Sequence, residues 1–222
     1  MLGSKNTFFD DRLTLNVEGY FYNYRDQQQV LVDGLSIRTD NADSEMQGID
    51  VEFDAEPIPG LRFDGTVSVM DTEFTEYLAV DPIDVLVAVN CRAEAQALVP
   101  FQTPFPGCSP TDWSGNELTR APKLQYSIGV EYDVYLGRFG TLTPRVQYYW
   151  QSESFYRAFN TETDRQSHYH QTDVKLTWRS PSESIYLEFF VDNLEDVEVF
   201  QNVLVGARSQ GSPHIAWYDR PR

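Results

Sequence analysis

The chain has 222 residues, with 17 Lys and Arg against 34 Asp and Glu, which gives a formal net charge of −17 at pH 7. This acidity argues against a nucleic-acid binder, because affinity for phosphate backbones comes from Lys and Arg. It does not indicate disorder, since 14% of the residues are aromatic and acidic disordered chains are poor in aromatics. The length predicts one domain or part of one.

Hydropathy along the chain predicts neither a membrane-spanning helix nor a secretory signal. The longest uninterrupted aliphatic run, residues 85–89, is far shorter than the roughly 20 residues that such a helix needs. The first residues show no charged segment followed by an apolar one, so we expect no signal peptide. Taken alone, these features favour a soluble protein, but the strand pattern argues against it.

Apolar and polar residues alternate with a period of two along most of the chain, and this pattern predicts strands. Seven strands are predicted, over residues 12–32, 36–56, 61–77, 120–136, 141–157, 168–180 and 184–199. Their connections are short near 56–60, 136–140 and 180–182, and long near 78–119, 158–167 and 200–216. Tight turns at one end and long loops at the other are typical of an outer-membrane barrel.

One phase of the predicted strands carries no Asp, Glu, Lys or Arg, although 23% of the chain is charged. On a lipid-facing surface a charge costs about 2–4 kcal/mol at the midplane, which explains such exclusion. The opposite phase carries the charges and is expected to face a water-filled lumen. It includes Asp50, Glu52, Asp54, Arg62 and Arg145.

A soluble β-sandwich also alternates apolar and polar residues, so strand length and aromatic placement decide between the two. The predicted strands exceed the usual length of about 5–6 residues. Aromatic residues also gather near strand ends, as in the girdles of membrane barrels. These residues are Tyr20, Phe21, Tyr22, Tyr24, Tyr148, Tyr149, Trp150, Phe155 and Tyr156.

Several short motifs follow one another in a characteristic order. They are FDDRLTLN at 9–16, YFYNYRD at 20–26, NAD at 41–43, QGIDVE at 47–52, GLRFD at 60–64, DTEFT at 71–75, GNELTRAP at 115–122 and DNLED at 192–196. By these motifs, their order and their spacing, the chain resembles the C-terminal part of the barrel of TonB-dependent outer-membrane receptors.

The resemblance implies an all-β, antiparallel, up-and-down transmembrane barrel in the outer membrane, which takes up a scarce ligand such as a siderophore, cobalamin or a glycan. In that family a 22-strand barrel surrounds a plug, and an inner-membrane complex transmits force to it. The expected partners are outer-membrane lipid, the remainder of the barrel, the plug, the TonB complex acting through the plug, and a small-molecule ligand. Residues 1–222 match only the C-terminal part of the barrel, without the plug, the TonB box or the terminal strand. We therefore expect a segment that does not import a ligand alone.

Asp50, Glu52 and Asp54 lie at i, i+2 and i+4 of one predicted strand. Paired carboxylates serve glycoside hydrolysis or bind Ca²⁺. We favour a lumen wall, because strand alternation alone brings them together, and Arg62 and Arg145 share that wall as possible partners.

His168 and His170 are predicted to point the same way from the loop end of a strand, as in some Zn²⁺ or Cu²⁺ sites. The sequence offers no third ligand, so we expect a solvated rim that contacts the ligand and no bound metal.

The long loop near 78–119 is the main candidate for ligand contact, since loops on a rigid scaffold usually carry recognition. The residues expected to contact a ligand there are Tyr77, Arg92, Phe101, Phe105 and Trp113. Cys91 and Cys108 either form a disulfide or remain two free thiols.

The sequence contains no serine-nucleophile elbow, P-loop or dinucleotide fingerprint, so we expect neither an enzyme nor a cofactor. The alternative interpretation is a soluble acidic β-sandwich or lectin-like binding module. A weaker one is a carbohydrate-active enzyme that uses Asp50 and Glu52.

Overall fold

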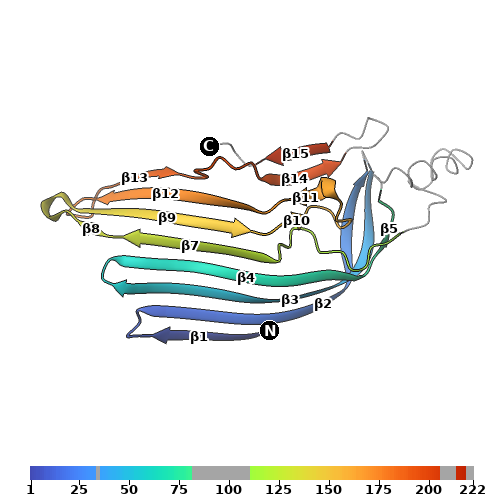
Figure 1. Cartoon of the computed structure of the whole chain (residues 1–222), viewed down its shortest axis with the longest axis horizontal. Helices are drawn as coiled ribbons and strands as arrows, with labels where there is room; N and C mark the ends of the chain where they lie inside the picture. Colours follow the sequence, from blue (N-terminus) through green and yellow to red (C-terminus); the bar gives the residue numbers. More distant parts are fainter. Residues whose placement is uncertain (34–35, 82–110, 206–213, 219–222) are drawn as a thin grey trace, which may run out of the picture.

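The computed structural model describes residues 1–33, 36–81, 111–205 and 214–218. Its main feature is one antiparallel sheet with the strand order β1-β2-β3-β4-β7-β9-β12-β13 (Figure 1). The strands are β1 (Leu2–Phe8), β2 (Leu13–Asp33), β3 (Ser36–Ile58), β4 (Leu61–Glu76), β7 (Leu124–Tyr132), β9 (Thr141–Gln151), β12 (Tyr169–Arg179) and β13 (Tyr186–Val191), with β8 (Val134–Tyr135) also paired to β9.

Three small strand pairs and two short 3₁₀ helices complete the described residues. The strand pairs are β5 (Leu78–Ala79) with β6 (Thr111–Asp112), β10 (Ser154–Phe155) with β11 (Arg165–Gln166), and β14 (Phe200–Val205) with β15 (His214–Tyr218). The 3₁₀ helices are η1 (Gly137–Phe139) and η2 (Glu162–Asp164). No helix among the described residues is long and apolar enough to cross a membrane.

The sheet confirms the predicted all-β, antiparallel architecture, with short turns at one end and long connections at the other (Figure 1). Several boundaries were wrong. The strand predicted over 120–136 begins only at Leu124, and the one predicted over 141–157 ends at Gln151. The last predicted strand ends at Val191 instead of 199, because Asn193 and Asp196 adopt positive φ angles and turn the chain. Part of the predicted connection at 200–216 forms the paired strands β14 and β15, which are short and separated by a segment rich in Gly and Pro.

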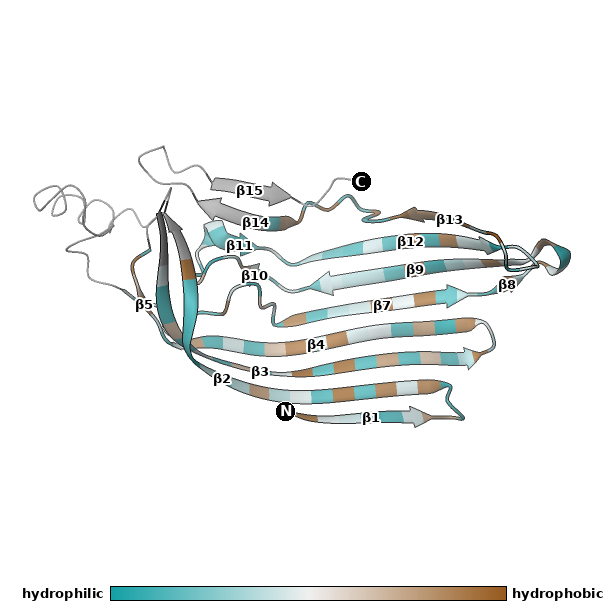
Figure 2. Cartoon of the chain, turned by 180° about the vertical axis from the view of Figure 1, so that it is seen from behind, coloured by the Kyte–Doolittle hydropathy of each residue, from teal (hydrophilic) through white to brown (hydrophobic). Residues whose placement is uncertain are grey.

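The pairing register keeps the uncharged positions of neighbouring strands opposite one another. Val51 of β3 pairs with Val67 of β4, which in turn pairs with Tyr126 of β7. The same face continues from Tyr126 to Trp150 of β9. Figure 2 shows the resulting alternation of hydrophilic and hydrophobic residues along β2, β3 and β4. The uncharged face is therefore continuous across the sheet.

This face has the height of a hydrocarbon layer. On β4 its apolar positions run from Leu61 to Val69, and the next two residues of the same phase are Asp71 and Glu73. About 9–11 residues of a tilted strand cross a bilayer, so the band matches a membrane thickness. Phe189 on the same face is 67% exposed. Within the described residues no second sheet packs against this face, so the β-sandwich alternative is wrong.

The buried core lies at the loop end. It consists of Ala42, Phe74, Tyr77, Ala79, Ala158 and Phe159, with Trp113 and Leu118 packed against it. We call these eight residues the rim core. Since Phe74 pairs with Ser44 and Ser44 with Tyr24 of the polar phase, the rim core is built on the inner face of the sheet.

Replacing Val67 with Lys places a charge in the middle of the uncharged face. The free energy of unfolding in lipid vesicles is expected to fall by about 2–4 kcal/mol, as measured by urea titration. The control Thr66→Lys alters the neighbouring residue, which faces the other side, and is expected to cost less than about 0.5 kcal/mol. Equal losses in both variants would contradict the assignment of the two faces.

Candidate functional site

The charges of the inner wall form cross-strand ion pairs on β3, β4, β7 and β9. The Arg62 guanidinium donates to Asp54 with an Nε–Oδ2 distance of 2.9 Å. Arg145 donates to both oxygens of Asp64, at 2.6 and 2.8 Å. Glu131 lies 3.2 Å from the same guanidinium. This half of the wall therefore neutralises most of its own charge.

Gly129 makes the pair between Asp64 and Arg145 possible. Asp64 lies on β4 and Arg145 on β9, with β7 between them. A Cβ atom on Gly129 would stand 2.8 Å from Asp64 Oδ2 and closer still to the Arg145 guanidinium. The missing side chain thus lets two residues on non-adjacent strands meet above the middle one, a role that sequence alternation did not reveal.

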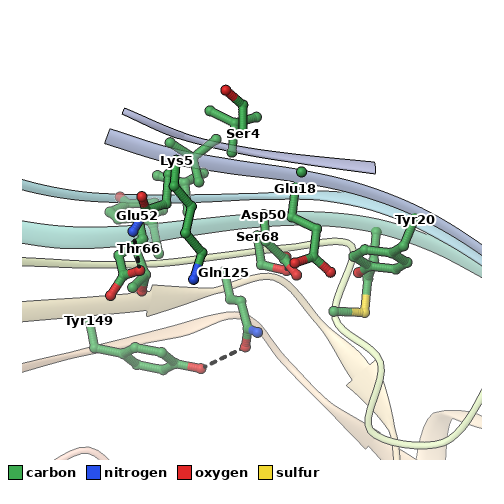
Figure 3. A pocket seen from close by; sticks show the side chains of 17 residues that line it. Ser4, Lys5, Glu18, Tyr20, Asp50, Glu52, Thr66, Ser68, Gln125 and Tyr149 are labelled. Carbon is green, nitrogen blue, oxygen red and sulfur yellow. Dashed lines mark hydrogen bonds between the residues drawn. The ribbon is translucent and has the colours of Figure 1, made fainter. Parts of the chain in front are cut away.

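The other half of the wall surrounds a hollow of about 880 Å³ (Figure 3). Its polar lining includes the carboxylates of Glu18, Asp50 and Glu52, with Lys5 as the described cation that lines it. Ser68 donates to Asp50 at 2.5 Å, and Asn16 donates to Glu52 at 3.0 Å. None of these three carboxylates forms an ion pair with a described residue, so this half of the wall stays acidic.

Tyr20, Tyr22 and Tyr24 also lie on this inner face. They pair with Gly48, Met46 and Ser44 and share the phase of Glu18. The prediction that they belong to an outer aromatic girdle was therefore wrong. In the period-two alternation Tyr20 and Tyr22 share the charged phase of Glu18, which points inward, whereas the clustering of aromatics suggested a girdle. Phe21, by contrast, pairs with Gln47 on the uncharged face.

Two residues predicted to contact a ligand belong to the rim core. Tyr77 is 0% exposed and stacks on Phe159 with ring centroids 6.3 Å apart. Trp113 meets Phe159 edge-on at 5.0 Å, and its indole N–H donates to the Ala79 carbonyl at 3.0 Å. Both side chains therefore support the loops. Their burial disfavours direct ligand contact.

The GNEL motif joins this core to the neighbouring loop. The Asn116 amide donates to the Ala158 carbonyl at 2.9 Å, and the Glu117 N–H donates to Asn160 Oδ1 at 2.7 Å. On the other side, the Leu118 N–H donates to Thr72 Oγ1 at 3.2 Å. The motif thus bridges β4 and the loop after β10.

A buried ion-pair cluster holds the same loops together. Arg157 donates to Asp164 at 2.5 and 2.8 Å and to Asp81 at 3.0 Å. Asp164 is 1% exposed and Asp81 is 4% exposed. Residues 76 positions apart in the chain meet here, which is why no local sequence signal predicted the cluster.

His168 and His170 lie on the uncharged side of the sheet. His170 pairs with Trp150 and stacks on Tyr148 at 5.6 Å, while His168 stacks on Trp150 at 6.5 Å. They belong to an aromatic patch on the face opposite the charged wall. Their position on that face disfavours contact with a ligand in the lumen.

The DNLED motif turns the chain at the end of β13. The Asn193 N–H donates to Asp173 Oδ1 at 2.8 Å, and the Leu194 N–H donates to the Thr172 carbonyl at 2.8 Å. The Glu195 carboxylate accepts hydrogen bonds from the hydroxyl and the amide of Thr172, which hold the pKa of Glu195 below its usual value. The motif anchors the end of β13 to β12.

The remaining predicted loop residues lie outside the described part of the chain. They are Arg92, Phe101, Phe105, Cys91 and Cys108. Among the described residues, no three His, Cys, Asp or Glu side chains gather in a way that could hold a metal ion.

Replacing Gly129 with Ala is expected to lower the free energy of unfolding by about 1–3 kcal/mol, because Asp64 and Arg145 must separate to admit the methyl group. Urea titration in lipid vesicles measures the loss. The control is Gly3→Ala, whose added Cβ would meet its nearest atom, the Val17 carbonyl oxygen, at an ordinary 3.6 Å. A Gly129→Ala variant as stable as this control would contradict the role of the glycine.

Replacing Arg157 with Met removes the guanidinium that pairs with two buried carboxylates, and is expected to destabilise the rim by about 3–5 kcal/mol. Hydrogen exchange of residues 78–81 and 157–164, read by mass spectrometry, should become faster. Arg157→Met with Asp164→Asn should recover part of the protection. Arg165→Met is the control, because Arg165 pairs with the more exposed Glu153 and Glu162. Exposed ion pairs of this kind contribute about 0–1 kcal/mol to stability. Unchanged exchange in Arg157→Met would refute the expectation.

Comparison with known proteins identifies the barrel. The family model described as TonB dependent receptor-like, beta-barrel matches residues 2–194. No curated protein sequence matches the chain.

Three solved structures resemble the chain at low sequence identity. The ferric yersiniabactin uptake receptor FyuA from Yersinia pestis is 19% identical with a TM-score of 0.69, over 98% of this chain and 27% of that one. The siderophore receptor PiuA from Acinetobacter baumannii is 15% identical with a TM-score of 0.66, over 99% and 26%. The ferric citrate transporter FecA is 14% identical with a TM-score of 0.62, over 99% and 28%.

At these identities the likeness shows the fold, and the chain spans about a quarter of the length of each of these structures. The family model covers residues 2–194, a range that contains the strands of the main sheet and the residues of the rim core. The chain therefore belongs to the TonB-dependent receptor β-barrels, a family of outer-membrane uptake receptors that are transporters and not enzymes.

Proposed function

We propose that the chain forms part of the conduit wall and of the extracellular rim of an energy-coupled importer for a scarce ligand of the siderophore, cobalamin or glycan class. The main support is the division of one sheet into an uncharged face and a charged face by register alone. A wall of this kind separates lipid from a polar lumen. The rim core supports the proposal because it gives the loop end a fixed shape.

The proposed partners are outer-membrane lipid, the remaining barrel strands, a plug inside the lumen and a TonB complex that acts through the plug. In the described residues, β1 and β13 each pair on one side only. An open strand edge in lipid leaves N–H and C=O groups without partners, at a cost of several kcal/mol each. We therefore propose that these residues act within a larger barrel and do not import a ligand alone.

Uptake measured in cells tests this function. Cells that express the receptor carrying these residues are expected to import at least one of three radiolabelled probe types, namely ferric siderophores, cyanocobalamin and neutral oligosaccharides. A protonophore should abolish this import, because the force on the plug derives from the inner-membrane potential. Cells that express residues 1–222 alone should import none of the probes. Import by residues 1–222 alone, or import that survives the protonophore, would refute the proposal.

A further inference from the structure

Tyr20, Tyr22 and Tyr24 form a continuous row of rings along the inner face of β2, which we call the tyrosine row. The centroids of Tyr20 and Tyr22 are 5.6 Å apart, and those of Tyr22 and Tyr24 are 5.9 Å apart. Tyr20 lines the hollow, while Tyr24 pairs with Ser44 next to the rim core. The row therefore leads from the loop end of the wall down to the hollow.

The register makes room for the first ring of the row. Tyr20 pairs with Gly48 of β3, and a Cβ atom there would stand 2.6 Å from Tyr20 Cζ. The Tyr20 ring thus lies across β3, where any larger residue would displace it. Figure 3 shows the ring at one end of the hollow, with Glu18 and Asp50 beside it. A ring held in this way offers a flat apolar surface at the edge of a polar cavity.

The remaining lining of the hollow is rich in hydrogen-bond acceptors. Glu18, Asp50 and Glu52 contribute carboxylates, and Lys5 is the described cation among them. On the opposite side Tyr149 lines the hollow, and its hydroxyl donates to Gln151 at 2.7 Å. An anionic ferric chelate would meet like charge here, which disfavours it. A neutral ligand with many hydroxyl groups would find acceptors for them.

We propose that the tyrosine row and the hollow form a binding subsite for a neutral oligosaccharide. This inference rests on the proposed import function and selects the glycan class within it. The apolar face of a sugar ring would stack on Tyr20 or Tyr22, because aromatic side chains bury a large flat area. The hydroxyl groups at the edge of the sugar would donate to Asp50, Glu52 and Glu18.

Calorimetric titration tests the subsite in the detergent-solubilised receptor that carries these residues. The probes are malto-, cello-, xylo- and chitohexaose, with ferric citrate as an anionic probe. At least one hexaose is expected to bind, and Tyr22→Ala should weaken its binding about tenfold. Tyr22→Phe, which keeps the ring, should retain binding within about threefold, a change of less than 1 kcal/mol. Tyr148→Ala, which removes a tyrosine from the uncharged face, is the matched control and should leave binding unchanged.

Two results of the titration would overturn the subsite. One is that no hexaose binds. The other is that a hexaose binds equally well to the receptor and to the Tyr20→Ala and Tyr22→Ala variants, whose folding is verified by their heat-modifiable migration in gels. Protonophore-sensitive import of a ferric chelate that is insensitive to Tyr22→Ala would also overturn it, while the proposed import function would stand. Absence of energy-dependent import of every probe type would refute the function itself.

Discussion

The pairing register of the main sheet is the constraint on which the other features depend. A slip of one residue between β3 and β4 would move Asp50, Glu52 and Asp54 from the inner wall to the uncharged face. In lipid each such charge costs about 2–4 kcal/mol near the midplane. The long ladder also satisfies the backbone N–H and C=O groups, which have no water to bond to in a hydrocarbon layer. Both requirements are met by one register, so other pairing registers of these strands are disfavoured.

The loop end is organised by different forces from the wall. There the chain folds inward over β3 and β4, and apolar side chains pack into the rim core. The buried cluster of Arg157, Asp164 and Asp81 joins segments that are distant in the chain. A buried ion pair of this kind contributes geometry more than stability, because desolvation offsets much of its attraction. The loops at this end are thus anchored at their bases to the sheet.

The inner wall is divided into two halves of different character. Between β3 and β13, Arg62, Arg145 and Lys175 face carboxylates across the strands. Toward β1 and β2 the carboxylates have no such cationic partners among the described residues. The tyrosine row extends from these carboxylates to the loop end. This asymmetry gives the wall one largely neutralised region and one that is acidic and aromatic. A neutral, hydroxyl-rich ligand fits the second region for the physical reasons given above.

The sequence by itself determined the strands, their alternation, the two faces and the family, because period-two patterning and turn residues act locally. The alternation in the sequence also gives Tyr20 the charged phase and His168 and His170 the uncharged phase, as in the structure. The aromatic clustering and the H-x-H pattern had suggested other roles for them. Only the tertiary structure decided the burial of Tyr77, the partial burial of Trp113 and the role of Gly129. These depend on contacts between segments far apart in the chain, which alternation along a single strand does not encode.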